Sequence, residues 1–405
     1  MRPQVNLDRR HARALDPRVS FSRASDATFQ MASGVWRRAA AGGARLGHAS
    51  NGTALGLVLE TEAVNRVRNP LSEVVTTGTI GSGGVLPTNW SWSPISGMAL
   101  EIVGVVVVDG VDCLRVRVSG TAGASGSCFL FCETALGIAA SNGQAWTQSA
   151  LLRRHAAPGT APVVQMRPIS RNSGGAQLTA FAGSSLTLSA PLTRFSSTVT
   201  IADATAAAIQ PAFAFPVTIS TAYDATFDIG WPQMELGALA SSPIIPPVGS
   251  PAATTRPADA MSALVTDFGA TAGLLAGTLV INGRTPAADA TAVALTFDDG
   301  TADNRIALSR QAGRAMRAAV VIGGSMVATL DGPTVADSTD FVLAVGFEAG
   351  TLALCCNGGT VVTAAPASIP PGLVRLAASG WGGSLARVGW WPRRLSATDL
   401  QSVTA

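Results

Sequence analysis

The sequence predicts an all-β protein. Only 13% of the 405 residues are charged and 47% are hydrophobic, and the chain contains 43 glycines and 23 prolines. This balance suits short strands joined by tight turns better than long solvated helices. At this length we expect two or three compact domains. So little charge also leaves wide uncharged surface, so we expect part of it to be buried between identical subunits.

The chain begins with a strand that precedes any segment long enough to form a core. In "LDPRVSFSRASDATF", residues 15–29, apolar and hydroxyl side chains alternate from Val19 to Ser22, as in a half-buried strand. We predict that residues 1–69 form a short module for attachment and oligomerisation. Its candidate contact residues are Arg18, Phe21, Arg23 and Trp36. An equal alternative is that the first strand only adds an edge strand to the jelly roll that follows.

Residues 70–243 are predicted to form a β-sandwich. Strand patterns occupy 100–108, 112–118, 127–133, 145–152, 162–167, 177–188 and 194–202, and "ATFDIGWPQMELG" at 225–237 closes the series. The segment "SSPIIPPVGSPAATTRPADA" that follows is rich in proline and small residues. It predicts a linker, which we place at residues 244–263.

Residues 264–405 are predicted to form a second sandwich. Apolar runs such as "AGTLVIN", "DFVLAVGF" and "TLALCC" alternate with turns such as "DDGTAD" and "NGG", which is typical of hairpins. In "RRLSATDLQSV", Ser396 is followed three residues later by Asp399. This spacing predicts one short helix capped by Ser396.

Charge and composition exclude several classes of partner. The net charge is +3, and the arginines are spread along the chain instead of forming one basic stripe, so we expect no nucleic-acid partner. The longest apolar run, residues 102–108, is too short to span a membrane, and no apolar signal region starts the chain. All 28 basic residues are arginine, which favours an acidic ligand, although a coding bias explains the same count.

The cysteines are expected to be reduced and mostly buried, in a protein made in the cytoplasm. Their number, five, is odd. Two of them, Cys355 and Cys356, are adjacent and would point to opposite faces of one strand.

Motifs for catalysis are absent from the sequence. The three histidines lack metal-ligand spacing, and "GASGS" at 123–127 lacks the last glycine of a nucleophile elbow. The sequence does not pair the candidate acids of a glycosidase, namely Glu101, Glu133, Asp228 and Glu235. We therefore expect a protein that is not an enzyme and needs no cofactor or metal. The acidic turn with Asp298, Asp299 and Asp303 offers ligands suited to Ca²⁺, but a plain hairpin turn explains it as well.

Sugar binding requires an aromatic face beside polar groups. Trp90 and Trp92 lie in the polar segment "TNWSW", and Trp381 is surrounded by glycine in "SGWGGS". These three tryptophans are the candidate carbohydrate-binding residues, because we expect their rings to be exposed. For Trp90 and Trp92 a second interpretation stays open, in which both rings plug the mouth of the jelly roll.

The chain resembles fibre and spike proteins of phages and phage-like particles. The stretches "FDDGTADNRIALSRQAGRAMRAAVVIGGSMVATL" and "LAASGWGGSLARVGWWPRRLSATDLQSVT" are similar to their concanavalin A-like (laminin-G-like) domain. "LDPRVSFSRASDATF" with "GLVLETEAVNRVRNP" resembles their amino-terminal module, and "DIGWPQMELGALASSPIIP" looks like the close of their carbohydrate-binding jelly roll. The family's Asn-x-Pro-Arg is altered here at Ala44 and Arg45.

The resemblance implies a receptor-binding spike or tail fibre on a virion or gene transfer agent. Its partners would be host capsular polysaccharide and other virion structural proteins, with a homo-oligomer, preferably a trimer, adding avidity to host attachment. A head spike is preferred over a tail fibre, because the first module leaves no room for a long shaft. The alternatives are a structural virion decoration without a ligand and, third, a capsule depolymerase.

Overall fold

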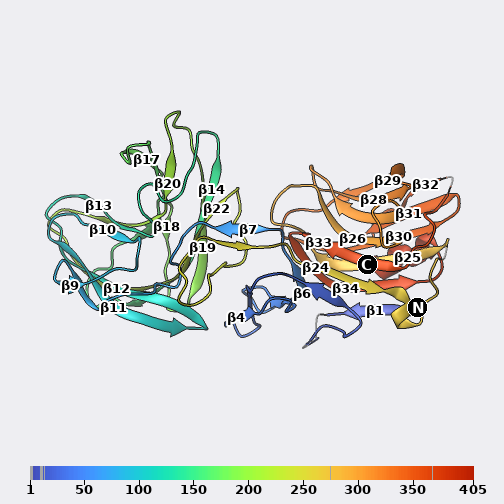
Figure 1. Cartoon of the computed structure of the whole chain (residues 1–405), viewed down its shortest axis with the longest axis horizontal. Coiled ribbons are helices and arrows are strands. Elements are labelled where there is room, and N and C mark those ends of the chain that lie inside the picture. Colours follow the sequence, from blue (N-terminus) through green and yellow to red (C-terminus); the bar gives the residue numbers. More distant parts are fainter. Residues whose placement is uncertain (1–2, 10–11, 13, 274, 367) are drawn as a thin grey trace. The chain divides into compact units, whose positions relative to one another are not determined.

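The computed structural model describes residues 3–9, 12, 14–273, 275–366 and 368–405. It is an all-β protein, as the composition predicts, and its strands pair antiparallel apart from the parallel pair of Gly78–Ile80 with Gly83–Gly84. The chain divides into two compact units. Unit 1 comprises residues up to Glu62 together with Pro257–Ala405, and unit 2 comprises Ala63–Arg256 (Figure 1). None of the helices in the described ranges is long and apolar enough to cross a membrane.

Unit 1 is a sandwich of two sheets. The β34 sheet has the order β32-β31-β30-β25-β34-β6-β5, and β1 also pairs with β34. Its strands are β1 (Val5–Asp8), β5 (Leu46–His48), β6 (Ala54–Leu59), β25 (Gly277–Arg284), β30 (Asp340–Glu348), β31 (Thr351–Cys356), β32 (Val362–Ala364) and β34 (Gly383–Trp391). The β26 sheet has the order β2-β24-β33-β26-β27-β28-β29. Its strands are β2 (Ser20–Ser22), β24 (Ala260–Leu264), β26 (Ala292–Asp298), β27 (Arg305–Arg310), β28 (Ala315–Ile322), β29 (Ser325–Thr334) and β33 (Arg375–Ser379).

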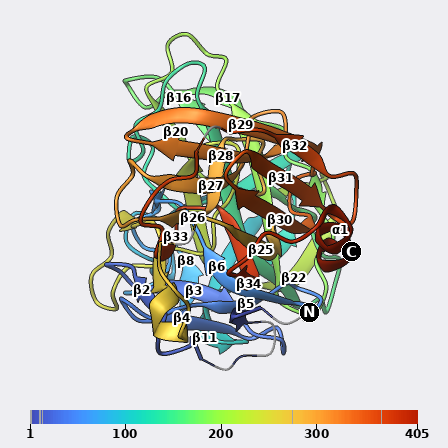
Figure 2. The ribbon, with the colours of Figure 1, turned by 90° about the vertical axis from the view of Figure 1, so that its right-hand side faces the viewer.

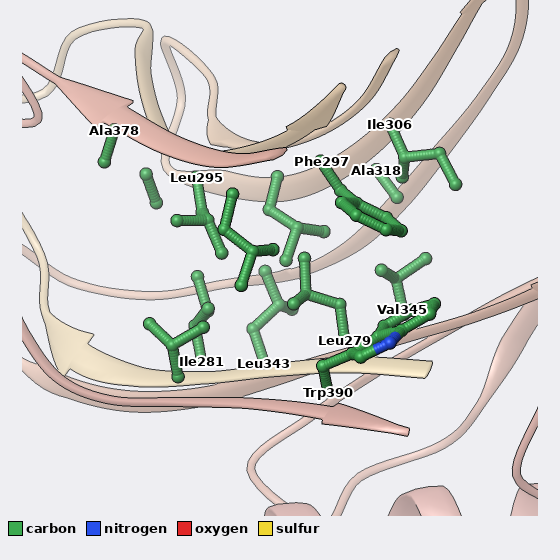
Figure 3. Close-up of a cluster of buried hydrophobic side chains, with 14 of the residues drawn as sticks. Leu279, Ile281, Leu295, Phe297, Ile306, Ala318, Leu343, Val345, Ala378 and Trp390 are labelled. Atoms are coloured by element: carbon green, nitrogen blue, oxygen red, sulfur yellow. The ribbon is translucent and has the colours of Figure 1, made fainter. Parts of the chain in front are cut away.

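Alternating apolar residues from both sheets fill the core of unit 1. Figure 3 shows Leu279, Ile281 and Trp390 of the β34 sheet facing Leu295 and Phe297 of the β26 sheet. The ring centroids of Phe297 and Trp390 lie 4.7 Å apart. The apolar contact between the two sheets is the main source of stability of the unit.

The outer face of the β34 sheet is covered by the terminal helix α1 (Ala397–Thr404). Ser396 caps this helix by accepting a hydrogen bond from the backbone N–H of Asp399, as the spacing predicts. Trp391, beside the core residue Trp390, packs on this outer face near Leu400. A short 3₁₀ turn, η1 (Val265–Phe268), follows β24.

The predicted boundaries of the first module and of the linker differ from the structure. The described residues between 3 and 69 do not form a separate module, because β1 and β6 pair with β34 and β2 pairs with β24. Figure 2 shows β6 beside β34. The strand predicted around Phe21 is β2, and it lies at the edge of a sheet of unit 1 and not of unit 2. The small hairpin of β3 (Ala27–Gln30) and β4 (Trp36–Ala39) also belongs to this unit.

The predicted linker at 244–263 is also ordered. Ile244 and Ile245 are buried, and β23 (Thr254–Arg256) pairs with β7 (Ala63–Asn65). Side-chain and backbone groups of the segment find partners inside the folded chain, as when the amide of Asn65 donates to the carbonyl oxygen of Ile244 at 2.9 Å. The proline-rich segment is therefore a loop that packs against the rest of unit 2, and not a flexible linker.

Unit 2 is a second β-sandwich, as predicted for the middle of the chain. The β22 sheet, with order β19-β14-β22-β12-β11-β8-β9, contains β8 (Gly78–Ile80), β9 (Gly83–Gly84), β11 (Met98–Val108), β12 (Val111–Thr121), β14 (Ala145–Ala156), β19 (Thr193–Thr200) and β22 (Ala222–Leu236). The β13 sheet, with order β10-β13-β21-β15-β18, contains β10 (Ser91–Ser93), β13 (Gly126–Phe131), β15 (Val164–Met166), β18 (Ser185–Leu186) and β21 (Ala212–Val217). A small sheet of β17 (Gln177–Ala180), β16 (Ile169–Arg171) and β20 (Ala208–Gln210) completes the unit.

The cysteines are free and buried, which confirms the prediction of buried thiols. Cys356 lies in the core between the sheets of unit 1, whereas Cys355 lies under α1, so the two point to opposite faces as predicted. Burial raises the pKa of the Cys356 thiol to about 12. At neutral pH this thiol therefore stays protonated and weakly nucleophilic.

We expect the native protein to react very slowly with an aromatic disulfide reagent, because its five thiols are buried. The same reagent in urea should titrate all five cysteines. The measurement is the absorbance of the released thiolate over time at pH 8. Rapid reaction of one or more equivalents in the native protein would contradict the buried placement of the cysteines.

Candidate functional site

The three tryptophans predicted to be exposed do not form an exposed sugar platform. Trp381 is fully buried, and its indole N–H donates to the carbonyl oxygen of Arg284 at 3.0 Å. Trp90 is only 7% exposed. Trp92 is partly buried and meets Phe215 edge-on, with ring centroids 6.0 Å apart, so it points into unit 2. The predicted exposure is wrong for Trp90 and Trp381, and the plug interpretation describes Trp90 and Trp92 better.

An aromatic surface that the sequence did not reveal lies on the outer face of the β13 sheet. Along β13, Cys128 and Leu130 point into the core, so the alternating residues Phe129 and Phe131 point outward. The rings of these two phenylalanines stack, with centroids 5.6 Å apart and planes inclined by 12°. Phe131 packs on Ile169 and is nearly buried, whereas Phe129 is partly exposed.

The floor beside the two rings consists of small residues. In the antiparallel register Phe129 lies opposite Ala214, and Phe131 lies opposite Ala212. Directly paired residues project from the same face of a sheet, so the alanine methyl groups lie beside the rings. Both alanines are fully buried and Phe131 is nearly so, and of the two rings it is therefore Phe129 that is accessible at this surface.

Polar groups border this aromatic strip on both sides. Ser91 and Ser93 lie opposite Phe131 and Phe129 on β10, and both are exposed. On the other side Gln165 lies opposite Ala214. We call this surface the Phe129 face, defined by Ser91, Ser93, Ser127, Phe129, Phe131, Gln165, Arg167 and Arg171.

Two arginines flank the rings. The guanidinium carbon of Arg167 lies 5.7 Å from the centroid of Phe129, and that of Arg171 lies 5.6 Å from the centroid of Phe131. Arg167 donates to the hydroxyl of Ser127 and to the carbonyl oxygen of Phe181, each at 3.2 Å. These contacts hold the planar guanidinium groups beside the ring faces.

Neither arginine has a carboxylate partner in the part of the chain that the structure describes. Arg171 donates to the side-chain oxygen of Gln210 at 2.7 Å and to the carbonyl oxygen of Gly175 at 3.0 Å, both neutral acceptors. Burial lowers the pKa of Arg171. The nearby carboxylate of Asp203 is instead engaged by the hydroxyls of Ser170 and Thr179. The Phe129 face therefore presents unneutralised positive charge.

The residues predicted for docking have contacts within unit 1. Arg23 is buried and pairs with Asp259 at 3.1 Å, and Trp36 is also buried. Their side chains therefore lie inside unit 1 and not on its surface, where the predicted contact with another subunit would require them. Phe21 packs against the core of the unit. Arg18 stays exposed; it pairs with Asp16 and its guanidinium lies 4.0 Å from the ring centroid of Phe268.

The carboxylates of Asp298 and Asp299 in the predicted acidic turn bind to other groups of unit 1. Asp298 pairs with Arg375 at 2.7 Å, and Asp299 accepts hydrogen bonds from Thr301 and Asn304. Within the described ranges no group of three or more His, Cys, Asp and Glu side chains is placed to hold a metal ion.

The four candidate glycosidase acids also form ion pairs or hydrogen bonds with neighbouring side chains. Glu133 pairs with Arg68, and Glu101 lies 3.5 Å from Arg117. Asp228 is buried and pairs with Arg115 and Arg153, which hold its pKa below the usual value although burial opposes this shift. Burial raises the pKa of Glu235, whose carboxylate accepts from the hydroxyl of Ser241 at 2.7 Å.

Comparison with known proteins gives distant similarities of fold. No protein-family model matches the chain, and no curated protein matches it. Among solved structures, the chain is similar to the Ruminococcus gnavus IT-sialidase CBM40 bound to α2,6-sialyllactose, with 20% identity and a TM-score of 0.28 over 33% of this chain and 85% of that chain.

Two further structures extend over more of the sequence. The tandem CBM22-1–CBM22-2 domain of Paenibacillus barcinonensis Xyn10C is 9% identical and covers 82% of this chain and 98% of that chain, with a TM-score of 0.28. Trypanosoma rangeli sialidase in complex with sialic acid is 10% identical over 74% of this chain and 61% of that chain, with a TM-score of 0.27. At these identities and scores, function has to be argued from the residues of the chain itself.

Proposed function

We propose that unit 2 binds polysaccharide through the Phe129 face. The observation that carries the proposal is the stacked pair of Phe129 and Phe131 on an outer sheet face, flanked by two arginines that have no carboxylate partner among the described residues. A pyranose ring has an apolar C–H side that packs on an aromatic ring, and hydroxyls that need hydrogen-bond partners at its rim. Phe129 supplies the ring, and Ser91, Ser93 and Gln165 supply the rim.

The charge of the face favours an acidic polysaccharide. Arg167 and Arg171 carry guanidinium groups that can donate to a sugar carboxylate in addition to their present neutral acceptors. Capsular polysaccharides that contain uronic or sialic acids have this chemistry. The all-arginine composition, which by itself was ambiguous, agrees with such a ligand.

The wider role that we propose is a spike or fibre on a phage-like particle, which attaches the particle to host capsule without degrading it. The sequence resemblance over most of the chain supports this role. Each sugar contact on an open sheet face is weak, and a homo-oligomer on one particle multiplies the contacts into useful adhesion. The protein would be made in the host cytoplasm and act on the particle surface.

One observation favours the alternative of a structural decoration protein. Val74, Val107 and Val248 of unit 2 are 77%, 72% and 76% exposed. Val74 and Val248, together with Val105, line a pocket of about 450 Å³. Exposed apolar clusters of this kind are typical of protein contacts. A decoration role predicts no binding to capsule at all.

The proposal is tested by a pull-down of the purified chain with encapsulated cells and with a capsule-deficient mutant of the same strain. Binding to the encapsulated cells alone, without released sugar, supports the proposed adhesin. Equal absence of binding to both strains would contradict it in favour of a decoration protein. Release of soluble oligosaccharide would contradict the proposed lack of enzymatic activity.

Replacing both Arg167 and Arg171 by glutamine should weaken binding to acidic polysaccharide about tenfold or more, because each charge-assisted hydrogen bond contributes about 1.5–3 kcal/mol. The salt dependence of binding should also become shallower. The measurement is affinity by calorimetry at two salt concentrations. The double variant Arg66→Gln/Arg154→Gln, which removes two exposed arginines outside the Phe129 face, is the charge-matched control. An equal loss in that control would mean that net charge, not the Phe129 face, determines binding.

A further inference from the structure

A second pocket lies in unit 1, on the β34 sheet and away from the core. Strands β1 and β6 both pair with the same edge of β34, β1 with residues 387–390 and β6 with residues 383–385. Between these paired segments lies Ala386, where the register of β34 against β25 also shifts by one residue. The pocket measures about 310 Å³ and is lined by Thr53, Ala54, Leu55, Asn282, Gly283, Arg284, Asp340, Phe341, Val342, Asn357, Ser384 and Ala386.

Glycines make the close strand approaches that shape this pocket. A Cβ on Gly283 would lie 2.3 Å from the carbonyl oxygen of Ser384, and a Cβ on Gly56 would lie 2.5 Å from Cα of Ala386. Gly56 also has a φ of 79°, which other residues adopt at a cost. The bulge at Ala386 is thus fixed from both neighbouring strands. Bulges of this kind are common beside binding sites, where they redirect side chains.

Two side chains in the pocket have polar atoms without partners. Ser384 is 3% exposed, and its hydroxyl has no hydrogen-bond partner among the residues that the structure describes. The side-chain oxygen of Asn282, also buried, has none there either. A buried polar atom without a partner costs about 1–3 kcal/mol, so natural proteins rarely retain two in one place without a function.

The remaining lining defines the chemistry of a ligand. Arg284 and Asp340 pair with each other at 3.1 Å, so the pocket carries no uncompensated charge from them. Asn357 is exposed and its side-chain oxygen accepts from the backbone N–H of Val342 at 2.7 Å, while Leu55 and Val342 add apolar surface. A ligand that fits must be neutral, must offer hydroxyl donors to Asn282 and Ser384, and must have an apolar side. The volume suits a single small ring.

We infer that this pocket, the Ser384 pocket, binds one neutral hexose ring, either as a free monosaccharide or as the end of a chain. The site is independent of the Phe129 face, because it lies in the other unit and selects a different ligand charge. Its role would be to add recognition of a neutral sugar to the acidic polysaccharide bound by unit 2.

The experiment is saturation-transfer NMR of the full chain with D-glucose, D-galactose and D-mannose, each at millimolar concentration. At least one sugar should receive saturation from the protein. Ser384→Ala should weaken its binding about tenfold, the equivalent of about one hydrogen bond. Asn282→Ala should have a similar effect, and Ser379→Ala, which truncates an exposed serine of the other sheet, should have none.

Loss of binding in Ser384→Ala will not reflect unfolding. Removing a hydroxyl that has no partner among the described residues is expected to leave the midpoint of urea denaturation unchanged or to raise it. Absence of saturation transfer to all three sugars, or wild-type binding in both pocket variants, would overturn the inference. Phe129→Leu should leave monosaccharide binding unchanged, so failure of the Ser384 pocket and failure of the Phe129 face are separate results. Displacement of the monosaccharide by an oligosaccharide of the same sugar would identify chain ends as ligands.

Discussion

Asp259→Ala is expected to lower the free energy of unfolding of unit 1 by about 3–5 kcal/mol, the usual cost of breaking a buried ion pair by removing one partner. Asp259 is fully buried and pairs with the equally buried guanidinium groups of Arg23 and Arg45. Its carboxylate also accepts from the backbone N–H of Glu60 at 2.8 Å. Without Asp259, both guanidinium groups lose a buried carboxylate partner, while Glu60 still pairs with Arg45 at 2.5 Å.

Urea denaturation followed by tryptophan fluorescence measures this effect. The transition of unit 1 should move to lower urea concentration, while that of unit 2 stays in place. Asp331→Ala is the control, because Asp331 is half exposed and pairs with Arg317 at the surface, where such pairs contribute about 0–1 kcal/mol. A change below 1 kcal/mol for Asp259→Ala would mean that the network of Arg23 and Arg45 does not hold the amino-terminal strands on the unit.

Phe129→Leu is expected to weaken polysaccharide binding about 30-fold or more. Aromatic residues at the centre of a binding surface typically contribute at least about 2 kcal/mol, and a factor of ten in affinity corresponds to about 1.4 kcal/mol. Leucine keeps apolar bulk on β13 but loses the flat ring that stacks on Phe131 and on a pyranose.

The measurement is calorimetric titration with soluble capsular polysaccharide, and Phe195→Leu on β19 of the other sheet serves as the matched control. Both variants should keep the wild-type circular dichroism spectrum, because both retain an apolar side chain on a partly buried strand position. Equal affinity of Phe129→Leu and the wild type would exclude stacking on Phe129 as the basis of binding.

Local pattern predicted the strands and the helix cap, but not which strands pair across the chain. The hydroxyl alternation around Phe21 identified β2 as a half-buried strand. Its partner β24 begins at Ala260, more than two hundred residues later, and no local signal specifies that pairing. The prediction of a separate first module was wrong for this reason, because β2 packs on strands that come more than two hundred residues later in the sequence.

Exposure was the other property that local pattern could not give. The glycines around Trp381 suggested an open loop, yet a Cβ on Gly383 would lie 2.6 Å from the indole nitrogen of Trp381. Glycine is present there because the ring packs closely against the backbone. The outward position of Phe129 and Phe131 could not be predicted either. Apolar residues lie on both faces of β13, so the sequence predicts a strand buried on both sides and not one with an outward aromatic face.

The most direct test of the central claim is an NMR titration of the full chain, labelled at alanine methyl groups, with oligosaccharides of the host capsule. Ala212 and Ala214 pair with Phe131 and Phe129 on the Phe129 face, so their buried methyl groups lie beside the two rings and report on the ring positions. We predict that these two signals shift in step with binding, through the ring currents of the reoriented phenylalanines. Binding without any shift of Ala212 and Ala214 would contradict the assignment of the polysaccharide site to the Phe129 face.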